Sequence, residues 1–242
     1  MDNTPQANNS TLLQVRNLSM RYGKTHALKG INLEIPKGKI VGILGPNGSG
    51  KTTLIKTVMG LISDYTGEIR IANHPPGPMA NAHIAYLPDR SHIPSWFTTS
   101  RAITFFADFY KDFNKTQAHE MLENMKIPLR KNLSALSRGM QEKVQLALVM
   151  SRQCDLYVLD EPIGAVDPAS REFIVETILK NFPVGGSILL STHIISDIEP
   201  ILDEAVFLKE GEIIMHNEVE KIREDHGESL DGLFREVFRN VY

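Results

Sequence analysis

The sequence predicts an α/β domain with a mainly parallel sheet, and two patterns indicate this fold class. Short apolar runs alternate with segments of helical periodicity in the first and last thirds of the 242-residue chain, as they do where helices cross over between parallel strands. Between about residues 90 and 153 the apolar spacing is helical throughout. A parallel sheet interrupted by a helical insertion is therefore the simplest layout.

Each expected element follows from its own apolar spacing and from the breaking residues around it. The expected strands are 12–15, 27–35, 39–44, 67–72, 156–160 and 187–192. The expected helices are 53–59, 100–110, 116–125, 139–151 and 171–181. Residues 1–11 are polar and rich in asparagine, so we expect a flexible tail there.

One octapeptide fills every fixed position of the phosphate-binding pattern G-x-x-x-x-G-K-[ST]. It lies between the strand 39–44 and the helix 53–59, where its backbone N–H groups and the start of the helix can face phosphate oxygens. Lys51 is expected to reach the β- and γ-phosphates, and the Thr52 hydroxyl to ligate Mg²⁺. The predicted nucleotide-binding residues of this segment are Gly45, Pro46, Asn47, Gly48, Ser49, Gly50, Lys51, Thr52 and Thr53.

The strand 156–160 ends in two carboxylates, at the edge of the sheet where open α/β folds bind ligands. Asp160 is expected to hold Mg²⁺, directly or through water. Glu161 is expected to act as general base or to orient the attacking water. An acidic pair at a strand end is more often a solvated turn, and it is the phosphate-binding loop in the same chain that favours the functional interpretation.

Composition limits the classes of partner and the cellular compartment that we expect for this chain. The net charge is −3 with interspersed signs, so we expect no nucleic-acid partner. The single cysteine, Cys154, cannot form an internal disulfide, so we expect a buried thiol in a reducing compartment. No basic-then-apolar leader opens the chain and no apolar run approaches the ~18 residues that span a bilayer. We expect a chain that is soluble by itself, with any membrane function supplied by another subunit.

The hexapeptide Leu136-Ser137-Arg138-Gly139-Met140-Gln141 precedes a helix and resembles the LSGGQ signature of the ATP-binding-cassette (ABC) family. Further positions of that family's pattern follow in the family's order along nearly the whole chain, from about Leu12 to the C-terminal helix. They are Tyr22 at the aromatic A-loop position, Asp89 at the Q-loop position, Asp167 in the D-loop and His193 as the switch histidine.

The resemblance implies a P-loop NTPase fold of the ABC type: a mainly parallel RecA-like core sheet, an N-terminal antiparallel β-subdomain and an inserted α-helical subdomain. The implied single domain spans 12–242. Within it, 12–89 would hold the β-subdomain and the phosphate-loop part of the core, 90–153 the helical insertion, and 154–215 the second part of the core. Residues 216–242 would form a C-terminal extension helix.

The same resemblance implies roles for individual side chains. Tyr22 would stack on the adenine ring. Ser137 and the backbone N–H of Gly139 would clamp the γ-phosphate held by a second subunit, so that ATP joins two copies head to tail. His193 would hydrogen-bond the γ-phosphate and hold the water that Glu161 activates.

Three residues depart from the family pattern. Asp89 stands where the Q-loop glutamine is expected; its carboxylate can still ligate Mg²⁺, but its charge would weaken ATP binding or slow hydrolysis. Arg138 and Met140 depart from LSGGQ, whereas the serine and the second glycine are kept. We therefore expect clamping to persist.

In function, the chain resembles the ATP-hydrolysing subunit of bacterial two-component exporters for peptides, antimicrobial agents or lipids. The implied cofactors are ATP and Mg²⁺. The implied partners are an integral membrane permease subunit and a second, identical ATPase subunit, at the inner face of the cell membrane. Aromatic residues after Asp89, with Trp96 as the best docking candidate, would receive the permease, although Phe105 and Phe109 at helical spacing are more often core residues.

Two alternatives remain. A soluble ABC ATPase that acts as a regulatory or assembly factor, such as those of iron-sulfur cluster assembly, would carry the same catalytic pattern. A non-hydrolysing ATP-dependent clamp would rest on Asp89 alone and is disfavoured by Glu161.

Overall fold

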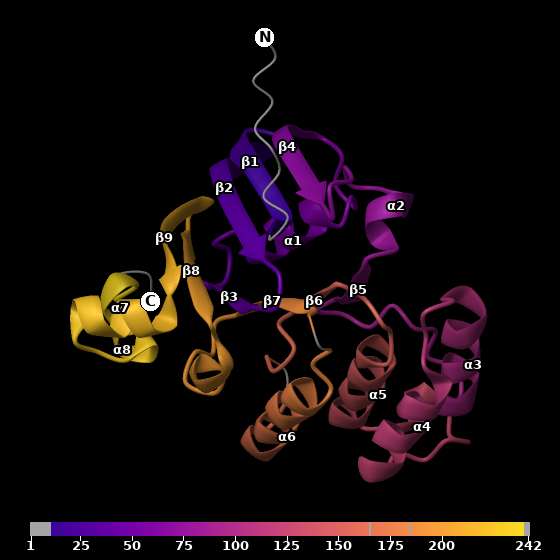
Figure 1. Ribbon diagram of the computed structural model, residues 1–242. Coiled ribbons are helices and arrows are strands. Elements are labelled where there is room, and N and C mark those ends of the chain that lie inside the picture. Colours follow the sequence, from indigo (N-terminus) through magenta and orange to yellow (C-terminus); the bar gives the residue numbers. More distant parts are fainter. Residues whose placement is uncertain (1–10, 165, 184, 240–242) are drawn as a thin grey trace.

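The computed structural model describes residues 11–164, 166–183 and 185–239, and in these residues the strands form two sheets (Figure 1). The larger sheet has the order β5-β6-β7-β3-β8-β9, and all neighbours are parallel except β8 and β9. The mainly parallel core sheet is therefore confirmed. Its strands are β3 (Ile40–Leu44), β5 (Ile84–Leu87), β6 (Leu156–Asp160), β7 (Ser187–Thr192), β8 (Glu204–Lys209) and β9 (Glu212–Glu218).

The smaller sheet is antiparallel and has the order β2-β1-β4, as the β-subdomain requires. Its strands are β1 (Thr11–Tyr22), β2 (Thr25–Pro36) and β4 (Tyr65–Ile71). Thr11 pairs with Pro36 in this sheet, so the expected tail 1–11 is wrong at its last residue. Residues 1–10 lie outside the described part of the chain.

Side chains of the core strands alternate between two hydrophobic clusters, one on each face of the sheet. On β6, Leu156 and Val158 belong to the cluster shared with the antiparallel sheet, whereas Tyr157 and Leu159 belong to the cluster shared with the helical insertion. Because both faces are covered, the strand has no polar side chain before Asp160. This explains why the core strands have continuous apolar sequences.

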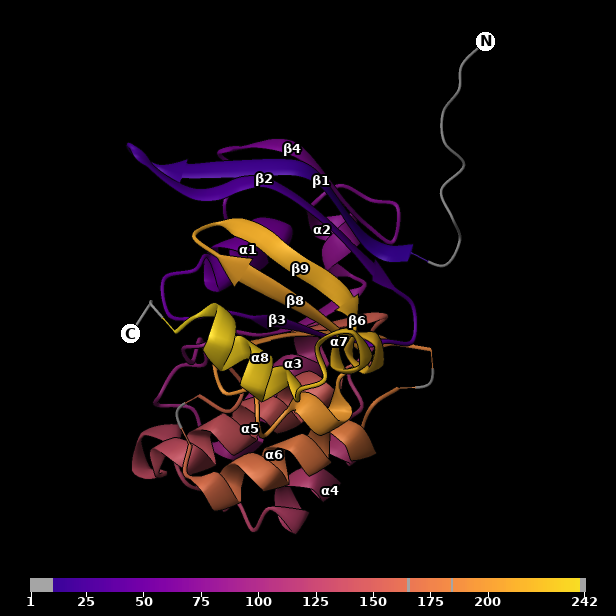
Figure 2. The ribbon, with the colours of Figure 1, turned by 90° about the vertical axis from the view of Figure 1, so that its left-hand side faces the viewer.

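Helices cover both faces of the core sheet (Figures 1 and 2). Helix α1 lies between the two sheets, α5 and α6 lie on the opposite face, and α3 and α4 pack beside α5. The N-caps of α3, α4, α5 and α6 are Thr98, Asn114, Ser137 and Asp167, whose side chains accept from the first turn. The helices are α1 (Lys51–Val58), α2 (Pro78–Asn81), α3 (Thr99–Phe109), α4 (Lys115–Asn124), α5 (Arg138–Met150) and α6 (Pro168–Lys180).

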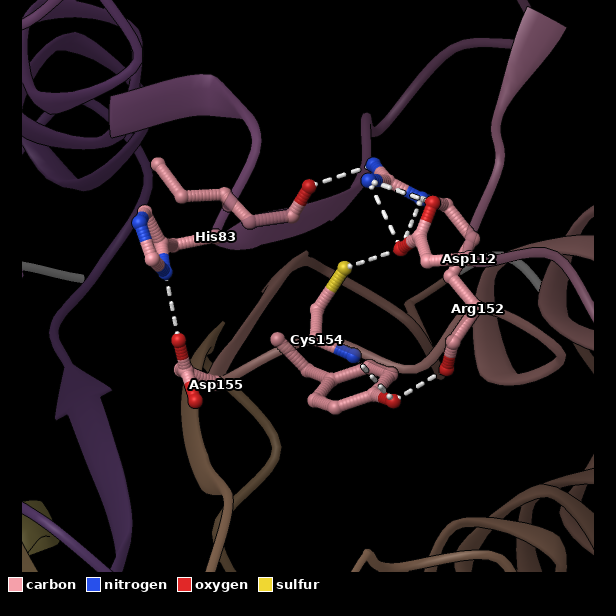
Figure 3. A network of polar contacts seen from close by, with 7 residues as sticks. His83, Asp112, Arg152, Cys154 and Asp155 are labelled. Carbon is pink, nitrogen blue, oxygen red and sulfur yellow. Dashed lines mark hydrogen bonds and ion pairs between the residues drawn. The ribbon is translucent and has the colours of Figure 1, made fainter. Parts of the chain in front are cut away.

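A buried ion pair attaches the helical insertion to the core sheet, as Figure 3 shows. Arg152 donates to both carboxylate oxygens of Asp112 at 3.0 to 3.4 Å and to the carbonyl of Ile84 in β5. Its guanidinium carbon also lies 3.8 Å from the centroid of the Tyr110 ring. The Cys154 thiol is 3.0 Å from Asp112; burial and this hydrogen bond raise its pKa. The cysteine is therefore part of the core.

The C-terminal segment differs from the single helix expected over 216–242. Strand β9 continues to Glu218, and two helices follow it, α7 (Val219–His226) and α8 (Leu230–Val237). The break falls at Gly227, whose φ of 68° ends α7 in the left-handed region. Ser229 then caps α8. Residues 240–242 lie outside the described part.

Glu199 connects this segment to the loop that follows β7. It lies in the 3₁₀ helix η2 (Glu199–Ile201) and accepts hydrogen bonds from the Arg223 guanidinium and from the backbone N–H groups of Leu230 and Asp231. The carboxylate thus holds α7 and the start of α8 against the core. Within the described ranges, none of the helices is both long enough and apolar enough to cross a membrane.

Candidate nucleotide site

The carboxyl ends of three neighbouring strands of the core sheet meet at one pocket. The phosphate-binding loop follows β3, Glu161 follows β6, and His193 follows β7 directly. This is the edge at which open α/β sheets bind ligands. The pocket has a volume of about 330 Å³ and is lined by Asn47, Gly48, Lys51, Thr52, Thr53, Asp89, Arg138, Glu161, Gly164 and His193.

The loop before α1 has the geometry that a phosphate group needs. Gly50 is the N-cap of α1 with φ of 110°, a conformation that other residues rarely adopt, and a Cβ there would lie 2.8 Å from the carbonyl oxygen of Ala27. The first N–H groups of α1 and its positive end then point at the pocket. Lys51 Nζ is held beside the loop, 2.7 Å from the carbonyl of Gly45.

Lys51, Glu161 and His193 form a chain of charged and polar contacts inside the pocket. Nζ of Lys51 lies 3.2 Å from Oε1 of Glu161, and the other oxygen, Oε2, lies 3.0 Å from Nδ1 of His193. Three predicted site residues from three different segments are therefore brought together. Glu161 is oriented by partners on both of its carboxylate oxygens.

The backbone of Glu161 is unusual and directs the side chain. Its φ is 51°, in the left-handed region that non-glycine residues seldom occupy. Its N–H donates to the carbonyl and the hydroxyl of Ser191 in β7, and its carbonyl accepts from Gly164. Such conformations cost of order 1–3 kcal/mol and occur mainly at functional sites.

Asp160 is arranged as a metal ligand would be. Its Oδ1 accepts from the hydroxyls of Ser191 at 2.6 Å and Thr52 at 3.2 Å. Its Oδ2 is buried and has no hydrogen-bond partner among the described residues. Burial raises the pKa of this carboxyl, the two hydroxyls oppose the shift, and Asp89 and Glu161 add to it. A hard cation such as Mg²⁺ fits this unpaired oxygen and the adjacent Thr52 oxygen.

Nine of the predicted site residues do not line this pocket: Tyr22, Gly45, Pro46, Ser49, Gly50, Ser137, Gly139, Asp160 and Asp167. Five of them lie next to lining residues, because Gly45, Pro46, Ser49 and Gly50 belong to the phosphate-binding loop and Asp160 ends β6. Tyr22 ends β1 and is half exposed, while Ser137, Gly139 and Asp167 lie at the starts of α5 and α6. Asp89, in contrast, does line the pocket. In this single chain Tyr22, Asp167 and the signature residues Ser137 and Gly139 therefore do not line the pocket, whereas the signature residue Arg138 does.

Three contributors were missing from the sequence-based site: Ser191, Arg138 and Gly164, which lines the pocket and donates its N–H to the Glu161 carbonyl. Ser191 bonds Asp160 and Glu161, and it could have been noticed because it is a polar residue in an otherwise apolar strand just before His193. Arg138 lines the pocket although the signature comparison treats it only as a departure. The Arg138 side chain lines the pocket, whereas the neighbouring Ser137 does not.

Comparison with known proteins agrees with this geometry. Residues 28–164 match the family described as ABC transporter. The SkfA peptide export ATP-binding protein SkfE of Bacillus subtilis is 30% identical over 84% of this chain and 87% of its own length. The zinc transport system ATP-binding protein TroB of Treponema pallidum is 34% identical over 75% of this chain and 71% of its own.

The solved structure of an ATP-binding subunit of an ABC transporter superposes with a TM-score of 0.83 and 28% identity, covering 93% of this chain and 99% of that one. The chain belongs to the ABC transporter family. It is the ATP-binding subunit of such a transporter, from a family of cassettes that hydrolyse ATP.

Proposed function

We propose that this subunit powers a membrane exporter of peptides, antimicrobial agents or lipids. The observation that carries its catalytic part is the convergence of Lys51 and His193 on the two carboxylate oxygens of Glu161 in one pocket, at 3.2 Å and 3.0 Å. The export direction is supported by the likeness to SkfE and by the signature Leu136-Ser137-Arg138-Gly139-Met140. The likeness to TroB supports zinc import as a second candidate.

In the proposed reaction, the chain's residues position ATP and a water molecule. Lys51 and the N–H groups at the start of α1 bind the β- and γ-phosphates. Glu161 accepts a hydrogen bond from the attacking water, and His193 fixes the carboxylate that does so. Thr52 and Asp160 would hold Mg²⁺, which neutralises charge on the leaving phosphate when bound.

The proposed permease contact is an aromatic surface at the start of the helical insertion, made of Trp96, Phe105 and Phe109. Trp96 is 59% and Phe109 68% exposed. The rings of Phe105 and Phe109 stack 6.1 Å apart, and Arg101 lies 4.6 Å from the Trp96 ring. A permease helix with apolar and acidic side chains would bury these rings and meet the guanidinium.

Glu161→Gln tests the catalytic assignment and the proposed homodimer together. Without the carboxylate, ATP binds but its hydrolysis slows by about 100-fold or more, so two copies remain joined by ATP. Size-exclusion chromatography with ATP should show a dimer for this variant and a monomer for Glu220→Gln, a control at an exposed glutamate of α7. A Glu161→Gln protein that stays monomeric and turns ATP over at the normal rate would contradict the assignment.

Co-purification from detergent-solubilised membranes of the native host tests the partner. A polytopic membrane protein in stoichiometric amount is expected with the unmodified chain and with Leu61→Ala, which alters an exposed apolar residue elsewhere. It should be lost with Trp96→Ala/Phe109→Ala. Recovery of an active ATPase with no membrane partner would favour a regulatory or assembly factor. A purified complex whose ATP turnover responds to zinc, and not to peptide or lipid, would favour import.

A further inference from the structure

Two charged residues face the nucleotide pocket from different parts of the fold. Asp89 follows β5 in the core, and Arg138 is the first residue of α5 in the helical insertion; both line the pocket. In the family pattern both positions hold an uncharged residue: glutamine at the position of Asp89 and glycine at the position of Arg138. The two departures therefore add charges of opposite sign to the same pocket.

Glu142 forms an ion pair with Arg138 and is affected by the negative charge of Asp89. Its Oε1 lies 3.2 Å from Nε of Arg138, one turn earlier in α5, while its Oε2 is buried without a partner in the described part of the chain. Burial raises the pKa of Glu142, its hydrogen bond to Arg138 opposes the shift, and the charge of Asp89 adds to it. The Glu142 carboxylate is thus paired with the Arg138 guanidinium, and Asp89 is a second carboxylate that lines the same pocket as Arg138.

The charges that line the pocket balance only when Arg138 is counted. The lining carboxylates are Asp89 and Glu161, and the lining Lys and Arg side chains are Lys51 and Arg138. Lys51 is already paired with Glu161 at 3.2 Å. Arg138 contacts Glu142 through Nε at 3.2 Å, and its side chain is 75% exposed, so its other N–H groups can turn toward a phosphate or toward Asp89.

We propose that Arg138 is a positioning residue for ATP in its own chain, which offsets the charge of Asp89 at the edge of the pocket. Triphosphate affinity then depends on the pair: without Arg138 the charge of Asp89 repels the γ-phosphate, and without Asp89 the guanidinium is no longer drawn to the edge of the pocket. This inference rests on the proposed nucleotide site. It explains how a carboxylate can occupy the Q-loop position beside an anionic ligand.

A double-mutant cycle on the full chain tests the pair, with the Kd for Mg·ATP and for ADP measured by calorimetry. Arg138→Ala is expected to weaken ATP binding by about tenfold near 0.1 M salt, and by less at 0.5 M salt because the interaction is screened. ADP affinity should change by less than about twofold, since ADP lacks the γ-phosphate. Arg138→Lys should retain most of the ATP affinity, because the charge is kept.

Coupling between the two sites is the deciding quantity. In the Asp89→Gln background, removal of Arg138 should change the ATP Kd by no more than about threefold. An equal loss in both backgrounds would overturn the pairing. Unchanged ATP affinity in Arg138→Ala, with loss only of the ATP-dependent dimer, would overturn the role within one chain and place Arg138 against a second copy.

Two controls distinguish a failure of this proposal from a failure of the proposed nucleotide site or of the fold. Lys51→Ala should weaken ATP binding at least about tenfold in every background; unchanged binding would mean that the nucleotide site itself is wrongly assigned. Thermal unfolding of Arg138→Ala without nucleotide should match the unmodified protein, since the side chain is largely exposed. An altered Kd with unaltered unfolding is therefore an effect on the ligand.

Discussion

Lys51 and Glu161 form an ion pair inside the pocket, with 3.2 Å between Nζ and Oε1 and side chains only 5% and 12% exposed. A triphosphate would compete with the glutamate for the same ammonium group. Binding of ATP would therefore exchange one partner of Lys51 for another and leave Glu161 held by His193 alone. The proposed general base would become available when the substrate arrives.

Replacement of Lys51 should weaken ATP binding without disrupting the fold. Lys51→Ala is expected to weaken ATP binding at least about tenfold, because a charge-assisted hydrogen bond to phosphate is lost. Equilibrium binding of a fluorescent ATP analogue measures this. Lys56→Ala, at an exposed position of the same helix, should bind normally; equal weakening by both changes would point to damage of α1 instead.

His193→Ala should impair hydrolysis more than binding. The imidazole fixes Glu161 at 3.0 Å, so its removal is expected to lower kcat by about 100-fold while the ATP Kd changes by less than about threefold. Phosphate release under saturating ATP gives the rate. His26→Ala, on the exposed start of β2, is the matched control. A normal kcat in His193→Ala would remove the histidine from the mechanism.

The Arg152–Asp112 pair should contribute to stability. Arg152→Met removes one partner of a buried pair and leaves the Ile84 carbonyl unsatisfied, so the free energy of unfolding should fall by about 3 kcal/mol. Urea denaturation measures it. The exposed pair of Glu176 and Lys180 offers a contrast, and Glu176→Gln should cost less than about 0.5 kcal/mol. Equal effects would mean that burial of the pair does not matter.

Attachment of the C-terminal helices should weaken in acid. Burial raises the pKa of Glu199, but the N–H of Leu230, Arg223 and the N–H of Asp231 together bring it below its ordinary value of 4.5. A carboxyl with a lowered pKa stabilises the folded state above its ordinary pKa, and this contribution is lost as the pH falls through the folded-state pKa. The protection factors of the α8 amides against hydrogen exchange, which correct for the intrinsic rate at each pH, should therefore fall below about pH 4.5. In Glu199→Gln these protection factors should be low at every pH.

The Cys154 thiol should be unreactive in the native protein. Burial and the contact with Asp112 raise its pKa, and the thiolate is the nucleophile. Labelling by a maleimide at pH 7 should be at least about 100-fold slower than in denaturant. Rapid labelling of the native protein would show that the segment around Asp112 opens readily.

Motifs that depend on local geometry could be predicted from the sequence. The phosphate-binding loop, β6 and β7 were predicted because their apolar runs and glycines act over a few residues. β5, β8 and β9 were missed. Exposed residues alternate with half-buried residues along β9, and none is fully buried. The pairing of β9 with β8 depends on the tertiary structure, and the apolar run 205–208 alone does not specify it.

Long-range polar contacts could not be predicted. No spacing rule joins Asp112 to Arg152 or Arg138 to the pocket of Asp89, since these depend on how the helical insertion sits against the core. The left-handed backbone conformation of Glu161 could not be predicted either, because glutamate has no preference for positive φ. The two-helix C-terminus depends on Gly227, one residue in a segment that otherwise favours helix.

The position of β3 in the sheet affects how the protein is made. This strand carries the phosphate-binding loop, yet it pairs with β7 and β8, which are synthesised long after it. A nascent chain on the ribosome therefore cannot complete the ATP pocket until residues 187–209 have emerged. Truncated translation products would be unable to hold nucleotide, so ATP would stabilise only chains that have been finished.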